Sequence, residues 1–268
     1  MLSTIALNTL RMGHRNHGAR IVLVLSLLLL GVAWLGGNFS PRQPQTVALD
    51  VGISVLRILM TLLTLYWVQE LVAKEVERKT ILWSLSYPQS RNTFLVGRYL
   101  GIFILISLAL TFLATATLIA GQLALGDYQQ TTAVAGAGAY WLTIALFAVD
   151  LLAVSSFTLL VSSIATVPML PFFMGLAFAI CARSIGPTLS YLASPESQGI
   201  TRVQAVSASI ERFGWLLPDL SRLDVRHIAL YQIAPDKTAI AAAASQTLVF
   251  SLMMLVLACV AFQRRQFN

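Results

Sequence analysis

Charged residues are scarce in this sequence. Aspartate, glutamate, lysine and arginine make up only 11% of its 268 residues, whereas a soluble globular domain carries about 25%. Hydrophobic residues account for 57% of the chain. These few charged side chains cannot cover the apolar surface that the chain would expose to water. The composition therefore excludes an ordinary soluble fold and predicts a membrane protein.

The chain also lacks the residue sets on which most enzymes and metalloproteins depend. Its two cysteines, Cys181 and Cys259, lie in apolar runs and are expected to be small buried side chains rather than a disulfide or a metal pair. The three histidines form no ligand set. No HExxH, GxSxG or GxxxxGKS/T motif is present. We therefore expect no catalytic site, no metal or cofactor bound by this chain, and no hydrolysis of ATP by a P-loop of its own.

Six apolar runs, each near the ~20 residues that cross ~30 Å of hydrocarbon, predict an all-α integral membrane protein with one transmembrane domain over 1–268. Membrane lipid is thus an expected partner. The mildly amphipathic segment 1–20 is expected to form an interfacial helix before the first span. Only a few residues separate the fourth and fifth runs, which predicts a tight helical hairpin. The predicted spans are 21–37, 51–69, 93–118, 139–161, 167–185 and 239–262.

The charges orient these spans. With the N-terminus inside, the inner side carries ten lysines and arginines against three acidic residues, while the short outer loops hold only Arg42. The long outer loop 186–238 balances five basic residues with five acidic ones. The positive-inside rule then places both termini in the cytoplasm, and we expect the cytoplasmic (inner) membrane of a bacterium. Orientation accounts for the sequence pI of 9.8 without a nucleic-acid partner.

The longest charged interruption in the first half of the chain is the segment 70–98. Two acid-before-base pairs four residues apart, Glu70 with Lys74 and Glu75 with Lys79, favour a helix. Pro88 should end this helix, because proline disfavours helical geometry at the preceding residue. A charged helix between two spans can lie along the membrane surface but cannot cross it. Two interpretations stay open: a loop helix that only sets the spacing of the spans, or a surface offered to a cytosolic partner.

The same segment resembles the signature of ABC-2 type transporter permeases. The resemblance rests on Glu77-Arg78-Lys79-Thr80-Ile81-Leu82, Tyr87-Pro88-Gln89-Ser90-Arg91 and Gly97-Arg98. The chain departs from the family pattern at Lys79, where glycine is usual. The resemblance implies a coupling helix over 70–87 that docks on a separate ATP-binding subunit. The residues that it implies for ATPase coupling are Glu70, Lys74, Glu75, Glu77, Arg78, Thr80, Pro88, Ser90 and Arg91.

Such a permease would be the membrane subunit of an ATP-driven exporter. Six spans are half of the usual twelve, so the resemblance implies a second permease chain, expected to be an identical copy, and two ATP-binding subunits that carry ATP and Mg²⁺. An ATP-independent carrier or a scaffold of an envelope assembly is the alternative. The halves show no inverted repeat, which weighs against a carrier. A membrane enzyme is the weakest interpretation.

The outer loop 186–238 has helical periodicity of its own. A stripe at spacings of three and four predicts a helix that Pro218 ends, and a similar stripe follows it. Asp236 is expected to cap the last span. The loop is predicted to be a cap over the outer ends of the spans, either inert or with a gating role. Residues 217–222 also resemble permeases grouped with copper-enzyme maturation systems. The first stripe is Val203, Val206, Ile210, Phe213 and Leu217, and the second is Leu220, Leu223, His227 and Leu230.

Apart from Arg98, which is counted with the charged segment 70–98, three charges fall inside the predicted spans: Arg57, Asp150 and Arg183. An intramembrane charge costs at least ~2.5–3.5 kcal/mol on insertion scales, so each needs a partner or a function. We expect a buried ion pair that joins Asp150 to Arg57 or Arg183, and take the pair with Arg57 as the hypothesis. Arg183 lies near enough to the predicted span end to snorkel. In the alternative, Asp150 lines a polar path for the substrate.

Overall fold

The computed structural model describes residues 2–13, 19–77, 90–125, 134, 136–167, 169–192, 217–231, 233–234 and 236–265. All regular elements in these ranges are helices, and six of them are long and apolar enough to cross a membrane, which confirms the predicted all-α membrane fold. These six helices are α2 (Ala19–Asn38), α3 (Pro44–Val68), α6 (Arg91–Leu125), α7 (Ala137–Ile164), α8 (Leu170–Leu192) and α11 (Lys237–Arg264).

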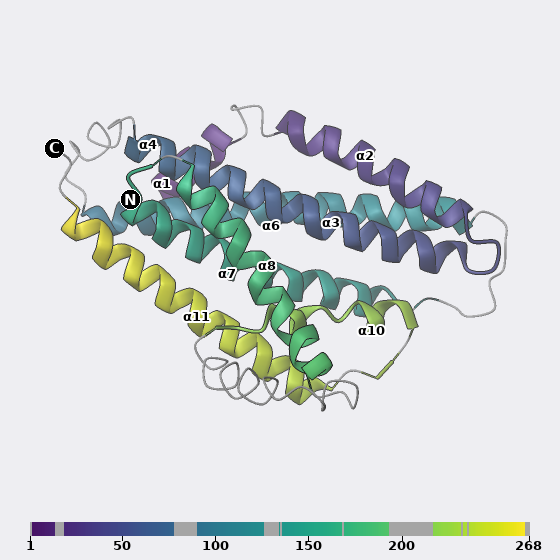
Figure 1. Ribbon diagram of the computed structural model, residues 1–268. Coiled ribbons are helices and arrows are strands. Elements are labelled where there is room, and N and C mark those ends of the chain that lie inside the picture. The colour runs from purple at the N-terminus through teal and green to yellow at the C-terminus, as the bar shows by residue number, and fades with distance from the viewer. Residues whose placement is uncertain are drawn as a thin grey trace.

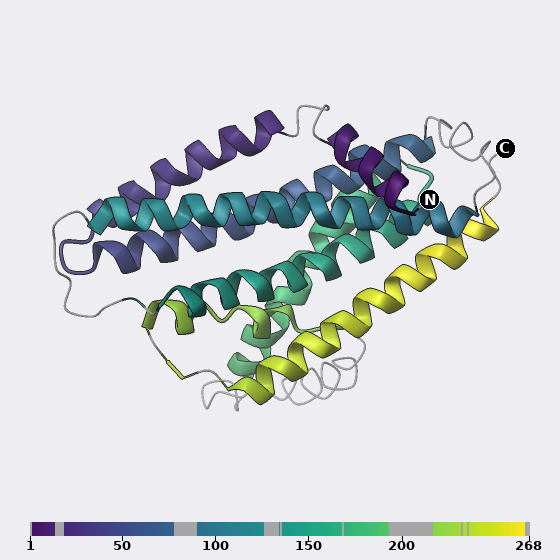
Figure 2. The same ribbon diagram turned by 180° about the vertical axis from the view of Figure 1, so that it is seen from behind.

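The spans form an elongated bundle in which both ends of the chain lie at the same end as α4 (Lys74–Glu77) (Figures 1 and 2). Helix α3 packs on α6, α2 packs on both of them, and α7 packs on α8 and α11. Fully buried apolar side chains from α3, α6 and α7 form the main core. Among the largest are Leu56, Met60, Ile102, Ile106 and Leu151.

The spans are longer than the apolar runs predicted. Helix α3 begins at Pro44 rather than near residue 51, since proline is tolerated in the first helical turn, where its missing amide would be unpaired anyway. Helix α8 continues to Leu192 and accommodates Pro187 inside the helix. The tight link between α7 and α8 is confirmed. Cys181, expected to be buried, is exposed on α8, because it lies on the face that points away from the bundle.

The N-terminal helix α1 (Leu2–Gly13) packs against the first half of α6. Gly97 and Gly101, spaced by four residues, allow this close approach. A Cβ atom built on Gly101 would lie 2.5 Å from Cβ of Thr9 and 3.0 Å from the backbone oxygen of Ala6. The helix predicted within 1–20 therefore exists, and it is docked on a span through a seam that only glycine fits.

At its C-terminal end α3 continues without a break. A π-helical turn, η2 (Gln69–Ala73), follows it and leads directly into α4. The backbone N–H of Lys74 bonds the carbonyl of Gln69, five residues earlier. The sequence predicted a separate surface helix over 70–87. Its described part, 70–77, is instead an extension of the span, while residues 78–89 lie outside the described residues.

The segment between α8 and α11, which we call the outer segment after the side predicted for the loop 186–238, contains a short 3₁₀ turn, η4 (Leu220–Leu223), and α10 (Arg226–Tyr231). The predicted apolar stripe is confirmed at Leu220, Leu223 and Leu230, which are buried, but His227 is exposed because 224–225 are not helical and shift the register. Asp236 caps α11 as predicted and accepts hydrogen bonds from N–H of Thr238 at 3.1 Å and of Ala239 at 3.2 Å. The helix predicted over 203–217 lies outside the described residues except for Leu217, which is exposed.

Candidate functional site

Asp150 in α7 is fully buried and joins two other spans. Its Oδ2 accepts a hydrogen bond from Nε of Arg183 at 3.1 Å, and Nη2 of Arg183 lies 2.9 Å from the same oxygen. Nη2 of Arg57 donates to it at 3.5 Å. The predicted pair of Asp150 with Arg57 is thus present, but Arg183 is the closer partner. Arg183 does not snorkel to the end of its helix, because α8 runs on to Leu192 and the buried carboxylate attracts the guanidinium inward.

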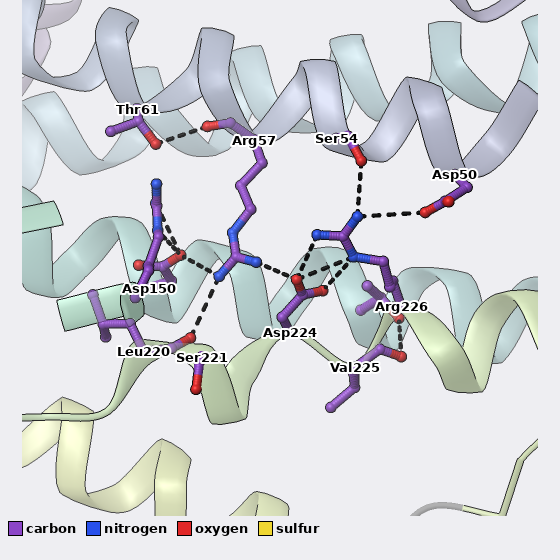
Figure 3. Close-up of polar contacts among 12 residues, drawn as sticks. Asp50, Ser54, Arg57, Thr61, Asp150, Leu220, Ser221, Asp224, Val225 and Arg226 are labelled. Atoms are coloured by element: carbon purple, nitrogen blue, oxygen red, sulfur yellow. Dashed lines mark hydrogen bonds and ion pairs between the residues drawn. The ribbon is translucent and has the colours of Figure 1, made fainter. Parts of the chain in front are cut away.

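Arg57 has a second acidic partner, Asp224, which comes from the outer segment (Figure 3). Asp224 is also bonded by Arg226, with Nη2 at 2.6 Å from Oδ2. Arg226 reaches back to α3, where its Nη1 donates to Ser54 Oγ at 2.8 Å and lies 3.4 Å from Oδ1 of Asp50. We call these six residues the outer charge network: Asp50, Arg57, Asp150, Arg183, Asp224 and Arg226.

The outer charge network has three arginines and three aspartates and is therefore neutral. It fixes the outer segment to α3, α7 and α8. Burial by itself raises the pKa of Asp224, but hydrogen bonds from Arg226 and the charge of Arg57 outweigh it, so that the pKa lies below its ordinary value. The hydrogen bond to Asp224 in turn raises the pKa of Arg226. Asp224 and Arg226 thus stay charged at neutral pH.

A second buried arginine lies near the bundle end that contains α4, which is the predicted inner end. Arg98 of α6 is 5% exposed and forms an ion pair with Glu75 of α4. Its Nη1 also donates to Thr9 Oγ1 at 3.2 Å and contacts Met12 Sδ at 3.4 Å, both on α1. We call Arg98, Glu75 and Thr9 the inner arginine node, because they connect α6, α4 and α1.

Glu75 was predicted as a docking residue on an exposed helix face. The structure turns its carboxylate inward, onto Arg98, and burial raises the pKa of Glu75 although the positive charge of Arg98 partly offsets this. The predicted pair of Glu70 and Lys74 is confirmed, with Nζ 2.5 Å from Oε2. Lys74 is partly exposed and available on the surface of the extension.

The other residues predicted for coupling divide into two groups. Ser90 caps α6, because its Oγ accepts a hydrogen bond from N–H of Thr93 at 3.1 Å. Arg91 bonds the end of α11, donating to the carbonyls of Gln263 at 3.1 Å and Arg265 at 3.0 Å. Glu77 is the last residue of α4. Arg78, Thr80 and Pro88 lie outside the described residues, and their predicted roles stay predictions.

Arg265 continues this chain of contacts to a third helix end. Its guanidinium bonds three carbonyls at the end of α7, those of Ser162 at 3.2 Å, Ser163 at 3.0 Å and Ala165 at 2.8 Å. Arginine side chains are favourable partners for the unpaired carbonyls at a helix C-terminus. The start of α6 is therefore connected through Arg91 and Arg265 to the C-terminal ends of α11 and α7. The sequence predicted a coupling role for Arg91 and counted Arg265 only as an inner-side charge, and no local pattern marked either as a partner of these helix ends.

Sequence reasoning found three members of the outer charge network and missed Asp50, Asp224 and Arg226. Asp224 lies 167 residues from Arg57 along the chain, so no local pattern joins them. The available signal was the unpaired arginine in the second span together with the balanced charges of the outer loop. Neither could specify which carboxylate would meet Arg57.

Comparisons with known proteins agree with this architecture. The sequence profile of the family described as ABC-2 family transporter protein matches residues 7–267. The chain is 33% identical over 112 residues to the protein named probable ABC transporter permease protein NosY of Pseudomonas aeruginosa. It is 31% identical over 111 residues to the protein of the same name of Stutzerimonas stutzeri. Each alignment spans about 40% of the relative's length. Since the profile covers nearly the whole chain, this multi-pass membrane protein belongs to the ABC-2 family of transporter proteins.

Proposed function

We propose that this chain is the permease subunit of an ATP-driven ABC exporter in the cytoplasmic membrane of a bacterium. Its family membership supports a transport role. The observation that carries the coupling role is the continuous extension of α3 through η2 into α4, with Glu75 ion-paired to Arg98 of α6. A force on the segment between α4 and α6 would act on two spans at once.

The partner in this proposal is a P-loop ATPase that binds ATP and Mg²⁺ and is encoded as a separate chain. Two such subunits would assemble with two copies of the permease. Closure of the ATPase pair would press on the segment 70–91 and shift the spans as rigid bodies between two packings. Export is the direction that the sequence resemblance implies.

Orientation follows from the charges. The inner side in this proposal is the bundle end where α4 and both chain ends lie (Figures 1 and 2). The outer charge network then lies toward the opposite face, where it holds the outer segment over α3, α7 and α8. The segment would close the outer end while the ATPase pair is open. Such closure would be the gating role that is one of the two interpretations of the loop 186–238.

The proposal is tested by affinity purification of the tagged protein in mild detergent, with identification of co-purifying chains and assay of ATPase activity. We expect a stoichiometric P-loop ATPase. Reversing two neighbouring charges of the segment, with Glu77→Lys and Arg78→Glu, should abolish stimulated ATPase activity and leave membrane insertion unchanged. Arg42→Glu in the first outer loop is the matched control and should leave the activity intact.

Two outcomes would contradict parts of this proposal. A folded, monodisperse preparation without any ATPase would favour the ATP-independent carrier or scaffold. Stimulated ATPase activity that survives the double charge reversal would remove the docking role from Glu77 and Arg78 while leaving the transporter class in place. The two results are distinguished in one experiment.

A further inference from the structure

The contacts of Arg91 and Arg265 join three helix ends in series. Arg91, the first residue of α6, donates from Nη1 to the carbonyls of Gln263 and Arg265 at the end of α11. Arg265 thus accepts through its backbone, and its guanidinium donates to three carbonyls at the end of α7. One residue therefore carries both contacts, the one that α11 receives from α6 and the one that it makes with α7.

The contact between Arg265 and α7 fixes direction as well as distance. Helix α7 ends at Ile164, and Ala165 has an extended backbone with ψ at 138°, so the last carbonyls have no intrahelical N–H to accept from. Nη1 of Arg265 donates to the carbonyls of Ser162 and Ser163, and Nη2 donates to that of Ala165. Because the guanidinium is planar and rigid, bonds from two of its nitrogens hold the end of α7 in one orientation.

The end of α11, which lies between these two contacts, is itself held in place. Helix α11 stays helical to Arg264 and packs along α7, and the side chain of Phe262 is fully buried in the main core. Figures 1 and 2 show this end of α11 beside the start of α6, at the bundle end that contains α4. A pull on the carbonyls at 263 and 265 would therefore move a packed helix end and not a loose tail.

We propose that Arg265 is a positioning residue for ATPase coupling, which receives movement of the segment 70–91 from Arg91 and passes it to α7. The inference rests on the proposed function, in which an ATPase pair presses on that segment. It adds a second route to the one through Glu75 and Arg98. The route through Glu75 acts on α3 and α6, whereas the two arginines in series extend the same movement to α11 and α7.

The test is amide hydrogen exchange, read by mass spectrometry, on the full-length permease in complex with its co-purified ATPase. Exchange is compared between the nucleotide-free complex and the complex trapped with ATP, Mg²⁺ and vanadate. In the wild type we expect trapping to change exchange at the ends of α7 and α11. Arg265→Met should abolish the change at the end of α7 and keep that at the end of α11, whereas Arg91→Met should abolish both.

Arg264→Met is the matched control, because it removes a cation from the exposed side of the same helix end and leaves these hydrogen bonds intact. Both changes should persist in it. The difference between the two nucleotide states separates coupling from simple helix capping. Loss of a cap alone would raise exchange at the end of α7 in both states alike and would leave the response to trapping in place.

The outcomes separate this inference from the proposed function. A wild-type complex that contains no ATPase, or that does not respond to trapping, would overturn the proposed function and the role of Arg265 with it. A response at the end of α7 that persists in Arg265→Met would overturn the role of Arg265 alone. Arg265→Lys is the milder variant, for use if the methionine variant does not assemble. Its single Nζ cannot replace two nitrogens, so the response at α7 should weaken, and an undiminished response would also overturn the inference.

Discussion

The outer charge network and the inner arginine node bury charge in different ways. In the outer network Asp150, Asp224 and Arg57 each have two oppositely charged partners, and six residues from three spans and the outer segment share the interactions. In the inner node Arg98 has one carboxylate partner among the described residues, Glu75, and its other contacts there include the neutral Thr9, Met12 and the ring of Phe94.

This difference has a structural consequence. A shared network tolerates the loss of a peripheral member, because the remaining charges keep a partner. A single pair does not, since removal of either member leaves a buried charge uncompensated, at a cost of roughly 3–5 kcal/mol. The outer network should therefore have one sensitive centre and a tolerant periphery, whereas the inner node should respond as one unit.

The largest effect is expected at the centre of the outer network. Asp150→Asn leaves Arg183 with no carboxylate among the residues that the structure describes, and should destabilise the protein by about 3–5 kcal/mol in thermal unfolding in nanodiscs. Adding Arg183→Met should recover much of this loss, because it removes the orphaned charge. Adding Arg57→Met should recover less, since Arg57 keeps Asp224. The reverse order of rescue would show that Arg57 is the dominant partner.

The next effect concerns the seam between α1 and α6. Gly101→Ala places a Cβ atom against Thr9 and should cost about 1–3 kcal/mol through overpacking. The matched control is Gly31→Ala in α2, where no atom lies within 4 Å of the new Cβ, and where alanine should be neutral or stabilising because of its higher helix propensity. Thermal unfolding compares the two variants. Equal midpoints would mean that α1 does not pack on α6 in the membrane.

The contributions of Glu75 and Asp224 to the stability of the protein should depend on pH with opposite signs. The folded pKa of Glu75 is raised by burial, so its contribution to stability is present below its ordinary pKa and is lost as the pH rises through the raised value. The folded pKa of Asp224 is lowered, so its contribution is present above its ordinary pKa and is lost as the pH falls through the lowered value.

Thermal midpoints of Glu75→Gln and Asp224→Asn, each measured against the wild type across the acidic range, isolate the two responses. The difference for Glu75→Gln should shift in favour of the variant as the pH rises past the raised pKa. The difference for Asp224→Asn should shrink as the pH falls below the ordinary aspartate range. Parallel pH profiles would contradict the opposite signs.

The smallest effect is expected at Arg91. Arg91→Met removes a cationic partner from the exposed carbonyls at the end of α11 and should cost about 0.3–1 kcal/mol. Amide hydrogen exchange near Gln263 should increase, while the outer network should be unaffected. Faster exchange in the outer segment of the same variant would indicate that the two ends of the bundle are coupled. It would contradict the expectation that they respond independently.

The sequence was sufficient for the six spans, the α7–α8 hairpin and the Asp236 cap, because each depends on a local pattern of apolar run, link length or capping residue. It was insufficient for the ends of α3 and α8, where Pro44 and Pro187 are helical despite their residue type. Packing across the bundle supplies stability that local propensity does not record.

The charged residues show the same limit more clearly. Arg57, Asp150 and Arg183 were recognisable because they interrupt apolar runs. Arg98 was not, because it was counted with the charged surface segment 70–98, whereas it lies within α6 and α1 covers it. The pairing of Glu75 with Arg98 rather than with a residue of its own helix depends on the path of the chain between them, which no spacing rule predicts.

The π-helical turn η2 has a further consequence for the direction in which α4 faces. A π turn accommodates one extra residue without adding a full α-helical turn, and each residue of an α-helix corresponds to a rotation of about 100° and a rise of 1.5 Å. Conversion of Gln69–Ala73 to regular α-helix would therefore rotate the residues that follow it about the helix axis. Glu75 would then point away from α6. The π-helical turn is therefore what directs the Glu75 carboxylate onto Arg98.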